Sequence, residues 1–230
     1  MATGSRSPQR PHIRFSVANA AGILLSALTL AGCIPYTVGS TAQPLRPGET
    51  QVAASWYFIP NGIELYDSSY TLSGIDVEVR RGLDNGVADV GIRVPSVSGI
   101  MLSYKRRLGA RGDFHRPAVA VQAGAGFVNL GQHFAGELGI IASGRERNSA
   151  TPYGGVRVVH VLPLSQGAVR DSPTAGGFFG IRLGSRDFGV SPEIGVYYDR
   201  SALGIRSTDF IVVPAITLHG SELLRILRGF

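Results

Sequence analysis

One residue in this chain carries a nucleophilic thiol: Cys33 is the only cysteine among 230 residues. A lone cysteine has no disulfide partner within the chain, so its thiol needs another use. Residues 1–14, well before it, hold three arginines and no acid, and the next sixteen residues hold no charge. A basic start, an apolar run and small residues before a cleavage point are typical of a secretory signal peptide. Sixteen apolar residues are fewer than the roughly twenty that a transmembrane helix needs.

The residues Leu30, Ala31, Gly32 and Cys33, at the end of this apolar run, resemble the lipobox of bacterial lipoproteins. In that family a diacylglycerol is attached to the cysteine sulfur, a dedicated peptidase cuts before the cysteine, and the new amino terminus is usually acylated, for example with palmitate. The resemblance implies a signal peptide over residues 1–32 and a lipid on Cys33. Two or three acyl chains suffice for stable anchoring. A cysteine behind an ordinary signal peptide is the alternative.

The same resemblance bears on partners and location. It implies the export and lipoprotein-processing machinery as partners, and membrane lipid as the partner of the acyl chains. Ile34 follows the cysteine, whereas the inner-membrane retention signal of the enteric version of this family has Asp there. The sequence therefore favours a lipid-anchored protein of the bacterial cell envelope, in the outer membrane.

The composition of the mature chain excludes some classes of function. Loss of residues 1–32 removes three arginines and no acid, so the formal charge falls from +6 to +3. The high pI belongs partly to the signal peptide, and no nucleic-acid partner is predicted. Charged residues make up only 17% of the chain, where about 25% is typical. No later segment is long and apolar enough for a helical span, so further contact with a bilayer requires strands.

Hydropathy alternates with a period of two from about residue 50 onward, which predicts β-strands. Residues 33–49 contain three prolines and no periodicity, and we expect a lipidated tether there. The ten expected strands cover residues 50–59, 72–82, 86–95, 99–107, 117–127, 133–142, 152–162, 176–184, 188–198 and 209–219. Most have the length of a tilted transmembrane strand. The expected fold is all-β: an antiparallel up-and-down barrel of eight to ten strands over residues 50–220, followed by a tail at 221–230.

The alternation separates an apolar face from a polar face. The polar face is mostly Gly, Ala and Ser with single charges, which suits a narrow interior better than a solvated exterior. We therefore expect the apolar face to contact lipid and the polar face to line the lumen. Equal numbers of acids and bases predict mutual pairing. The expected lumen charge network is Asp76, Glu78, Arg80, Asp89, Arg93, Lys105, Glu137, Arg157, Arg182 and Glu193. His160 falls among the outward valines of its strand and fits this pattern least well.

Two further patterns are typical of outer-membrane barrels. Aromatic residues gather near the expected strand ends, as interfacial girdles do: Trp56, Tyr57, Phe58, Tyr70, Phe127, Phe134, Tyr198 and Phe210. The segments RRGLDNGVADVGIRV and GIMLSYKRRL are similar to a recurring hairpin of poorly characterised bacterial outer-membrane β-barrel proteins. That resemblance implies the architecture and the barrel-assembly machinery as a partner, and no activity. An even strand count predicts both chain ends on the periplasmic side.

No catalytic site, metal site or cofactor is predicted. The five histidines lack metal-ligand spacing. His133 and Glu137 lie four residues apart on the polar face, with Ser103 or Ser191, so a lipid-modifying barrel enzyme is one alternative. The tail ends in Phe230 and predicts either a short amphipathic helix or a carboxy-terminal aromatic recognised during barrel assembly.

The favoured function is a lipid-anchored outer-membrane β-barrel with a structural role in the envelope or a narrow solute path, and without enzymatic activity. A barrel of this size has a lumen nearly filled by side chains, which argues against a general porin. A soluble lipocalin-like lipoprotein that binds an apolar ligand is a second alternative, and it requires the apolar face to point inward.

Overall fold

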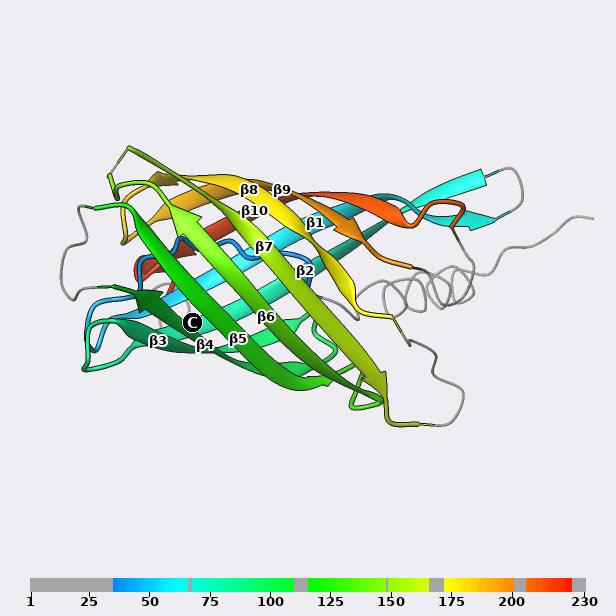
Figure 1. Cartoon of the computed structure of the whole chain (residues 1–230), viewed down its shortest axis with the longest axis horizontal. Helices are drawn as coiled ribbons and strands as arrows, with labels where there is room; N and C mark the ends of the chain where they lie inside the picture. Colours follow the sequence, from blue (N-terminus) through cyan, green and yellow to red (C-terminus); the bar gives the residue numbers. More distant parts are fainter. Residues whose placement is uncertain are drawn as a thin grey trace, which may run out of the picture.

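The computed structural model describes residues 35–65, 68–109, 116–147, 149–165, 172–200 and 206–224. Ten antiparallel strands form a closed barrel in which each strand pairs with the next and β10 pairs with β1 (Figure 1). The strands are β1 (Thr50–Leu65), β2 (Ser68–Gly82), β3 (Ala88–Pro95), β4 (Ile100–Leu108), β5 (Ala118–Val128), β6 (His133–Ser143), β7 (Ala150–Pro163), β8 (Thr174–Gly184), β9 (Gly189–Tyr198) and β10 (Phe210–Gly220). The expected fold class is confirmed. Within the described ranges, no helix has the length and apolarity needed to cross a membrane.

The first hairpin is longer than the sequence predicts. We expected the first strand to end at residue 59, because Pro60, Asn61 and Gly62 are typical of turns. Instead β1 continues to Leu65, and its pairing with β2 shifts between Ile59 and Ile63. An irregularity of this kind accommodates turn-forming residues inside a strand pair. The hairpin projects beyond the rest of the barrel on the right of Figure 1.

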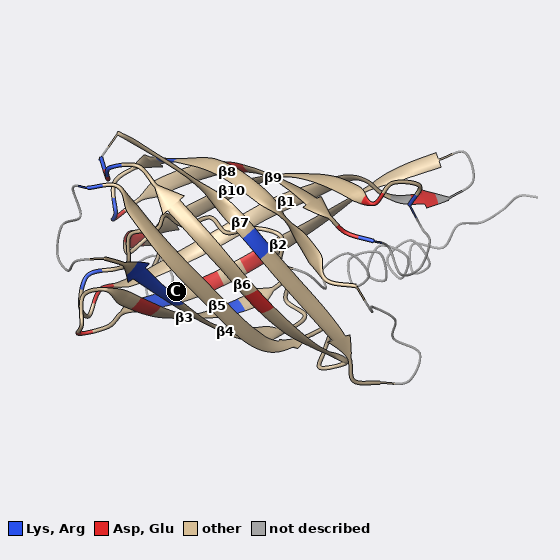
Figure 2. Ribbon diagram, viewed as in Figure 1, with Lys and Arg blue, Asp and Glu red and all other residues tan. Residues whose placement is uncertain are grey.

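The two faces of the barrel wall differ as expected. On β2, Ile75 is 51% exposed and Val79 is 41% exposed, while Asp76 and Arg80 between and beside them are buried. Figure 2 shows charged residues at the barrel ends and at a few mid-strand positions. The side chains at the mid-strand positions are buried, as those of Glu78 and Arg157 are, and so they point inward. The apolar face therefore forms the outside of the barrel and the charged face lines the lumen.

The two ends of the barrel are distinct. The strand-end rim, on the left of Figure 1, holds the start of β1, the end of β10 and the turns at residues 83–87 and 185–188. The Asn85 side chain accepts hydrogen bonds from two backbone amides in the first of these turns, and Gly86 has a φ of +66°, as a tight hairpin requires. The far rim holds the turns at residues 96–99 and 129–132.

The predicted aromatic girdle is correct only in part. Two ring pairs flank the far rim, with centroids 5.8 Å apart for Phe127 and Phe134 and 5.4 Å apart for Tyr198 and Phe210. Tyr57 does not belong to the girdle, because its ring is fully buried in the lumen. The expectation failed because Tyr57 lies between two outward-facing aromatic residues and alternation places it on the opposite face.

Apolar side chains fill the lumen toward the far rim. This apolar cluster consists of Tyr36, Tyr57, Ile59, Met101, Val128, Ala135, Val159, Val161, Tyr197, Ile211 and Val213. Val159 and Val161 come from β7, where alternation turns these two valines inward while Val156 and Val158 face outward. The half-buried His160 therefore shares the outward face of β7.

Candidate functional site

Charged side chains meet in the middle of the lumen and form ion pairs there. The guanidinium of Arg80 contacts Glu78 at 2.7 Å and also contacts Asp89, so β2 and β3 are joined by a shared cation. The ammonium of Lys105, on β4, lies 3.4 Å from the other carboxylate oxygen of Asp89. Ser103 donates a hydrogen bond to Glu78. All five side chains are buried, so each charge needs the partners it has.

A second group of charges spans the lumen between strands that are not neighbours in the sheet. Arg93 on β3 contacts Glu78 at 3.3 Å and Glu137 on β6 at 3.6 Å. Glu137 also contacts Arg157 on β7 and accepts a hydrogen bond from Gln122. Glu78 and Arg93 thus connect the two groups into one network.

Residues 35–45, which we call the plug, lie inside this lumen. All of them are buried except the partly exposed Ser40. The sequence predicted a tether here, and for these residues that expectation is wrong. The plug forms no helix or strand, so its backbone amides and carbonyls need partners from elsewhere. Inward-facing charges supply those partners, which explains why a segment without periodicity is buried.

Acids of the lumen accept hydrogen bonds from the plug backbone. The amides of Val38 and Gly39 donate to the two carboxylate oxygens of Glu193, at 3.0 and 2.9 Å. The amide of Leu45 donates to Asp89 at 3.0 Å. Such charge-assisted bonds are stronger than bonds between neutral groups.

Bases of the lumen donate to the plug carbonyls. Arg93 and Arg157 both donate to the carbonyl of Thr37, at 3.3 and 3.2 Å. Lys105 donates to the carbonyls of Thr41 and Gln43, at 3.0 and 3.2 Å. The charge network therefore has two tasks: its members neutralise one another, and they hold the plug.

The plug runs through the barrel from one rim to the other. Near its start, the Tyr36 hydroxyl donates to Asp199 just beyond β9, at the far rim. At its end, Leu45 contacts Asp89 at the beginning of β3, at the strand-end rim. The even strand count predicted both chain ends at one rim. Because the plug adds a passage through the barrel, residue 35 and Gly220 lie at opposite rims instead.

Three predicted members form no ion pair with the rest of the network among the described residues. Arg182 contacts Glu146 at 3.5 Å near the strand-end rim. Glu193 holds the plug and accepts a hydrogen bond from Tyr153 at 2.9 Å. Asp76 accepts hydrogen bonds from two neutral donors, the hydroxyl of Thr37 and the backbone amide of Ser96.

The sequence did not identify several polar partners at the rims. Asp199 was missed because it lies just beyond the last residue of β9. Its position in the alternation still places its side chain on the inward face. Arg186, in the turn after β8, contacts Glu146 at 2.6 Å and Glu49 at 3.1 Å. Burial lowers the pKa of Arg186, but the hydrogen bonds and charges of these two carboxylates outweigh burial and hold its pKa above the ordinary value.

The serine, histidine and acid considered for an enzyme do not come together. His133 contacts Asn129 in the turn, whereas Glu137 contacts Arg157. Residues four apart on a strand share a face but lie about 13 Å apart. Ser191 instead lies 3.0 Å from His219, a buried pair that the sequence did not reveal because it depends on the pairing of β9 with β10.

That pair lacks the third member of a triad. Nδ1 of His219 has no hydrogen-bond partner in the described part of the chain, so no carboxylate orients the ring. Among the described residues there is also no group of three potential metal ligands. Cys33 and the lipobox residues Leu30, Ala31 and Gly32 lie outside the described residues, as does the end of the tail.

The fold and the lumen define the chain as a plugged ten-stranded β-barrel. No family model and no curated protein matches its sequence. Among solved structures it is similar to neisserial surface protein A, at 10% identity and a TM-score of 0.38, over 74% of this chain and 96% of that one. It is also similar to Ail, the attachment invasion locus protein of Yersinia pestis, solved with the heparin analogue sucrose octasulfate, at 12% identity and a TM-score of 0.31, over 75% and 96%. Similarity this low says nothing about function.

Proposed function

We propose that this protein is a lipid-anchored β-barrel of the bacterial outer membrane, with a plugged lumen, a structural role in the envelope and no enzymatic activity. The observation that carries the proposal is the direction of the two faces. Large apolar side chains are exposed all around the wall, for example Leu102 at 63% and Val156 at 59%. Soluble monomers rarely expose contiguous apolar patches beyond a few hundred Å².

The same observation weighs against the soluble alternative. A lipocalin-like carrier needs an apolar cavity for its ligand. Here the middle of the lumen holds buried ion pairs and the plug. The cavities described beside the plug are about 10 and 20 Å³, enough for about one water molecule. The proposal therefore includes a lumen that is closed to solutes while the plug is in place.

The plug also bears on where a lipid would be attached. Tyr36 is held at the far rim, and Cys33 is only three residues before it, within about 11 Å along an extended chain. In outer-membrane barrels with an even number of strands, the start of the first strand and the end of the last strand both face the periplasm. With the strand-end rim in the periplasm, acyl chains on Cys33 belong to the outer side of the bilayer.

Labelling with radioactive palmitate tests the anchor. We expect the full chain to incorporate palmitate and the Cys33→Ala variant to incorporate none. Equal incorporation would remove the lipid from the proposal. Separately, a mature chain or variant that is monomeric and soluble without detergent would contradict the membrane barrel.

Protease access to intact cells tests the orientation. A protease site inserted after Ile34 should be cut by protease added to intact cells. The matched control is the same site inserted in the turn at residues 83–87, which should be cut only after the outer membrane is permeabilised. The reverse pattern would contradict the proposed orientation while leaving the anchor and the barrel intact.

A further inference from the structure

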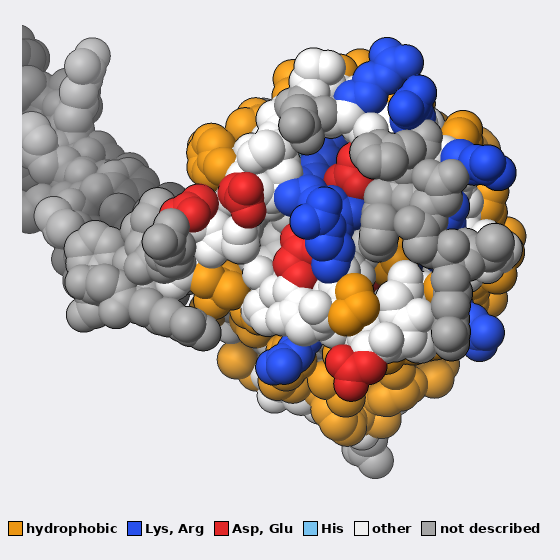
Figure 3. All heavy atoms as spheres, turned by 90° about the vertical axis from the view of Figure 1, so that its left-hand side faces the viewer, with side chains coloured by type: hydrophobic (Ala, Val, Ile, Leu, Met, Phe, Trp, Pro, Cys, Tyr) orange, Lys and Arg blue, Asp and Glu red, His pale blue; other side chains and the backbone are white. Residues whose placement is uncertain are grey.

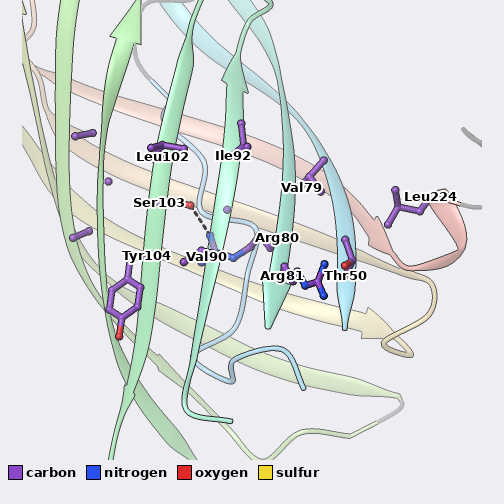
Figure 4. Close-up of a pocket in the computed structure, with 14 residues that line it drawn as sticks. Thr50, Val79, Arg80, Arg81, Val90, Ile92, Leu102, Ser103, Tyr104 and Leu224 are labelled. Atoms are coloured by element: carbon purple, nitrogen blue, oxygen red, sulfur yellow. Dashed lines mark hydrogen bonds between the residues drawn. The ribbon is translucent and has the colours of Figure 1, made fainter. Parts of the chain in front are cut away.

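The outer wall of the barrel has a groove that the plugged lumen does not explain. It has a volume of about 950 Å³ and lies on the outside of β2 to β5, near the strand-end rim (Figure 4). Its floor is built from outward-facing apolar side chains, of which Val79, Ile92 and Leu102 are 41–63% exposed. Cavities of this volume accommodate ligands of drug size or larger.

The register of the sheet explains why the wall is hollow here. Across neighbouring strands, Tyr104 on β4 pairs with Ala123 on β5, and Leu102 pairs with Ala125. Beyond β5, Leu138 on β6 is again large and 58% exposed. Ala123 and Ala125, with Gly136 on β6 beside Ala125, leave a trough along β5 that Tyr104, Leu102 and Leu138 border. Since strands are about 4.8 Å apart, the trough has the width of a hydrocarbon chain.

One end of the groove is cationic. Arg81 faces outward on β2, opposite Thr50 of β1, and both residues border the groove. Arg81 makes no ion pair with any acid in the described ranges. Arg106 faces outward on β4, two residues beyond Tyr104 toward the same rim. In Figure 3, which faces this end of the barrel, basic side chains lie at the edge of the apolar wall. A guanidinium at this end of the groove can bind a phosphate group through two hydrogen bonds.

We propose that the groove binds a glycerophospholipid, with an acyl chain along the alanine trough and the phosphate at Arg81 and Arg106. The charge of the two arginines complements an anionic headgroup, and the apolar floor complements the chain. The inference needs the barrel to lie in a membrane but does not depend on a lipid at Cys33.

Native mass spectrometry of the full processed chain in detergent, with phosphatidylglycerol or phosphatidylcholine added, tests this site. We expect one retained phosphatidylglycerol and weaker retention of phosphatidylcholine. The double variant R81Q/R106Q should lose roughly tenfold or more of the preference for phosphatidylglycerol, because each arginine near a membrane surface contributes to anionic lipid binding. A variant that fills the trough, A123L/A125L, should lose retention of both lipids.

The matched control removes two exposed arginines from the same rim away from the groove. R145Q/R147Q should retain phosphatidylglycerol like the unaltered chain, and heat-modifiable gel migration should show that every variant is folded. Retention that falls equally in R81Q/R106Q and R145Q/R147Q would overturn the proposal in favour of general attraction to a basic rim.

The other candidate occupant is the end of this chain. Leu224 borders the groove, and residues 225–230 follow it with three large apolar side chains. If lipid is retained only by a chain ending at Leu224, the tail fills the groove in the intact protein and the lipid proposal is wrong. Equal retention with and without residues 225–230 supports the lipid.

Discussion

The two parts of the lumen are closed in different ways. Toward the far rim, side chains such as Tyr57, Met101 and Val161 pack against one another as in a protein core. In the middle and toward the strand-end rim, charged side chains are buried with the plug as part of their hydrogen-bonding environment. Without the plug the apolar cluster loses only Tyr36, whereas buried charges need every partner. The plug is therefore a structural requirement of the charged part of the lumen.

Removal of the plug should have the largest effect. A refolded mature chain without residues 35–45 loses backbone partners of Glu193, Asp89 and Lys105. We expect water to enter the charged part and ionic current steps to appear in planar bilayers, where the complete chain gives none. If current is absent although the barrel is folded, the strand residues of the apolar cluster seal the lumen even without Tyr36, and the comparison needs revision.

Loss of one charge in the network should have the next largest effect. Glu137→Gln leaves Arg93 and Arg157 without their shared carboxylate, and breaking a buried ion pair on one side costs about 3–5 kcal/mol. Urea unfolding in detergent measures this free energy. The control Glu64→Gln changes a partly exposed carboxylate of the projecting hairpin that accepts hydrogen bonds only from Ser207 among the described residues, and it should change this free energy by about 1 kcal/mol or less. Similar losses in both variants would mean that the lumen charges are hydrated.

A smaller effect should follow from a change within the plug. Gly39 has a φ of +59°, and a methyl group there would lie 2.5 Å from the hydroxyl of Thr217. Gly48 also has a positive φ, of +74°, but no atom lies within 4 Å of the corresponding position. Gly39→Ala should cost about 1–3 kcal/mol more than Gly48→Ala in urea unfolding, because only Gly39 adds a clash to the backbone strain. Equal costs would show that the plug moves freely inside the barrel.

The smallest effect should come from the apolar cluster. Tyr57→Phe removes the hydroxyl that lies 3.2 Å from Ser96 but keeps the ring and its packing. The expected loss is about 0.5–1.5 kcal/mol in the same unfolding experiment. A loss as large as that of Glu137→Gln would show that polar contacts, and not packing, hold this part of the lumen as well.

Much of the barrel could be predicted from the sequence because strands, faces and tight turns depend on residues that are close together in the chain. A period of two identifies strands and faces, and Asn85 with Gly86 identifies a hairpin, without knowledge of the rest of the chain. The inward parity of residues such as Glu137 and Arg157 follows from the same alternation.

The contacts across the lumen could not be predicted, because they depend on how far each strand is shifted against the next. Arg93 and Glu137 lie on strands that are not neighbours, and Ser191 meets His219 only through the register of β9 with β10. The plug has neither periodicity nor a motif, so its burial depends entirely on charges contributed by distant strands. Its low content of large apolar residues made it look like a linker.

The plug also constrains the order in which the chain can assemble. A segment enclosed by an unbroken ring of strands is either surrounded while the ring is still open or passed through it from one end. The plug leads directly into β1, and β1 forms the seam of the ring with β10, the last strand of the chain. A bulky group at the amino end would rule out threading, so the seam would have to close around a plug already in position. Barrel closure would then be the final step, and one that an incorrectly placed amino-terminal segment could block.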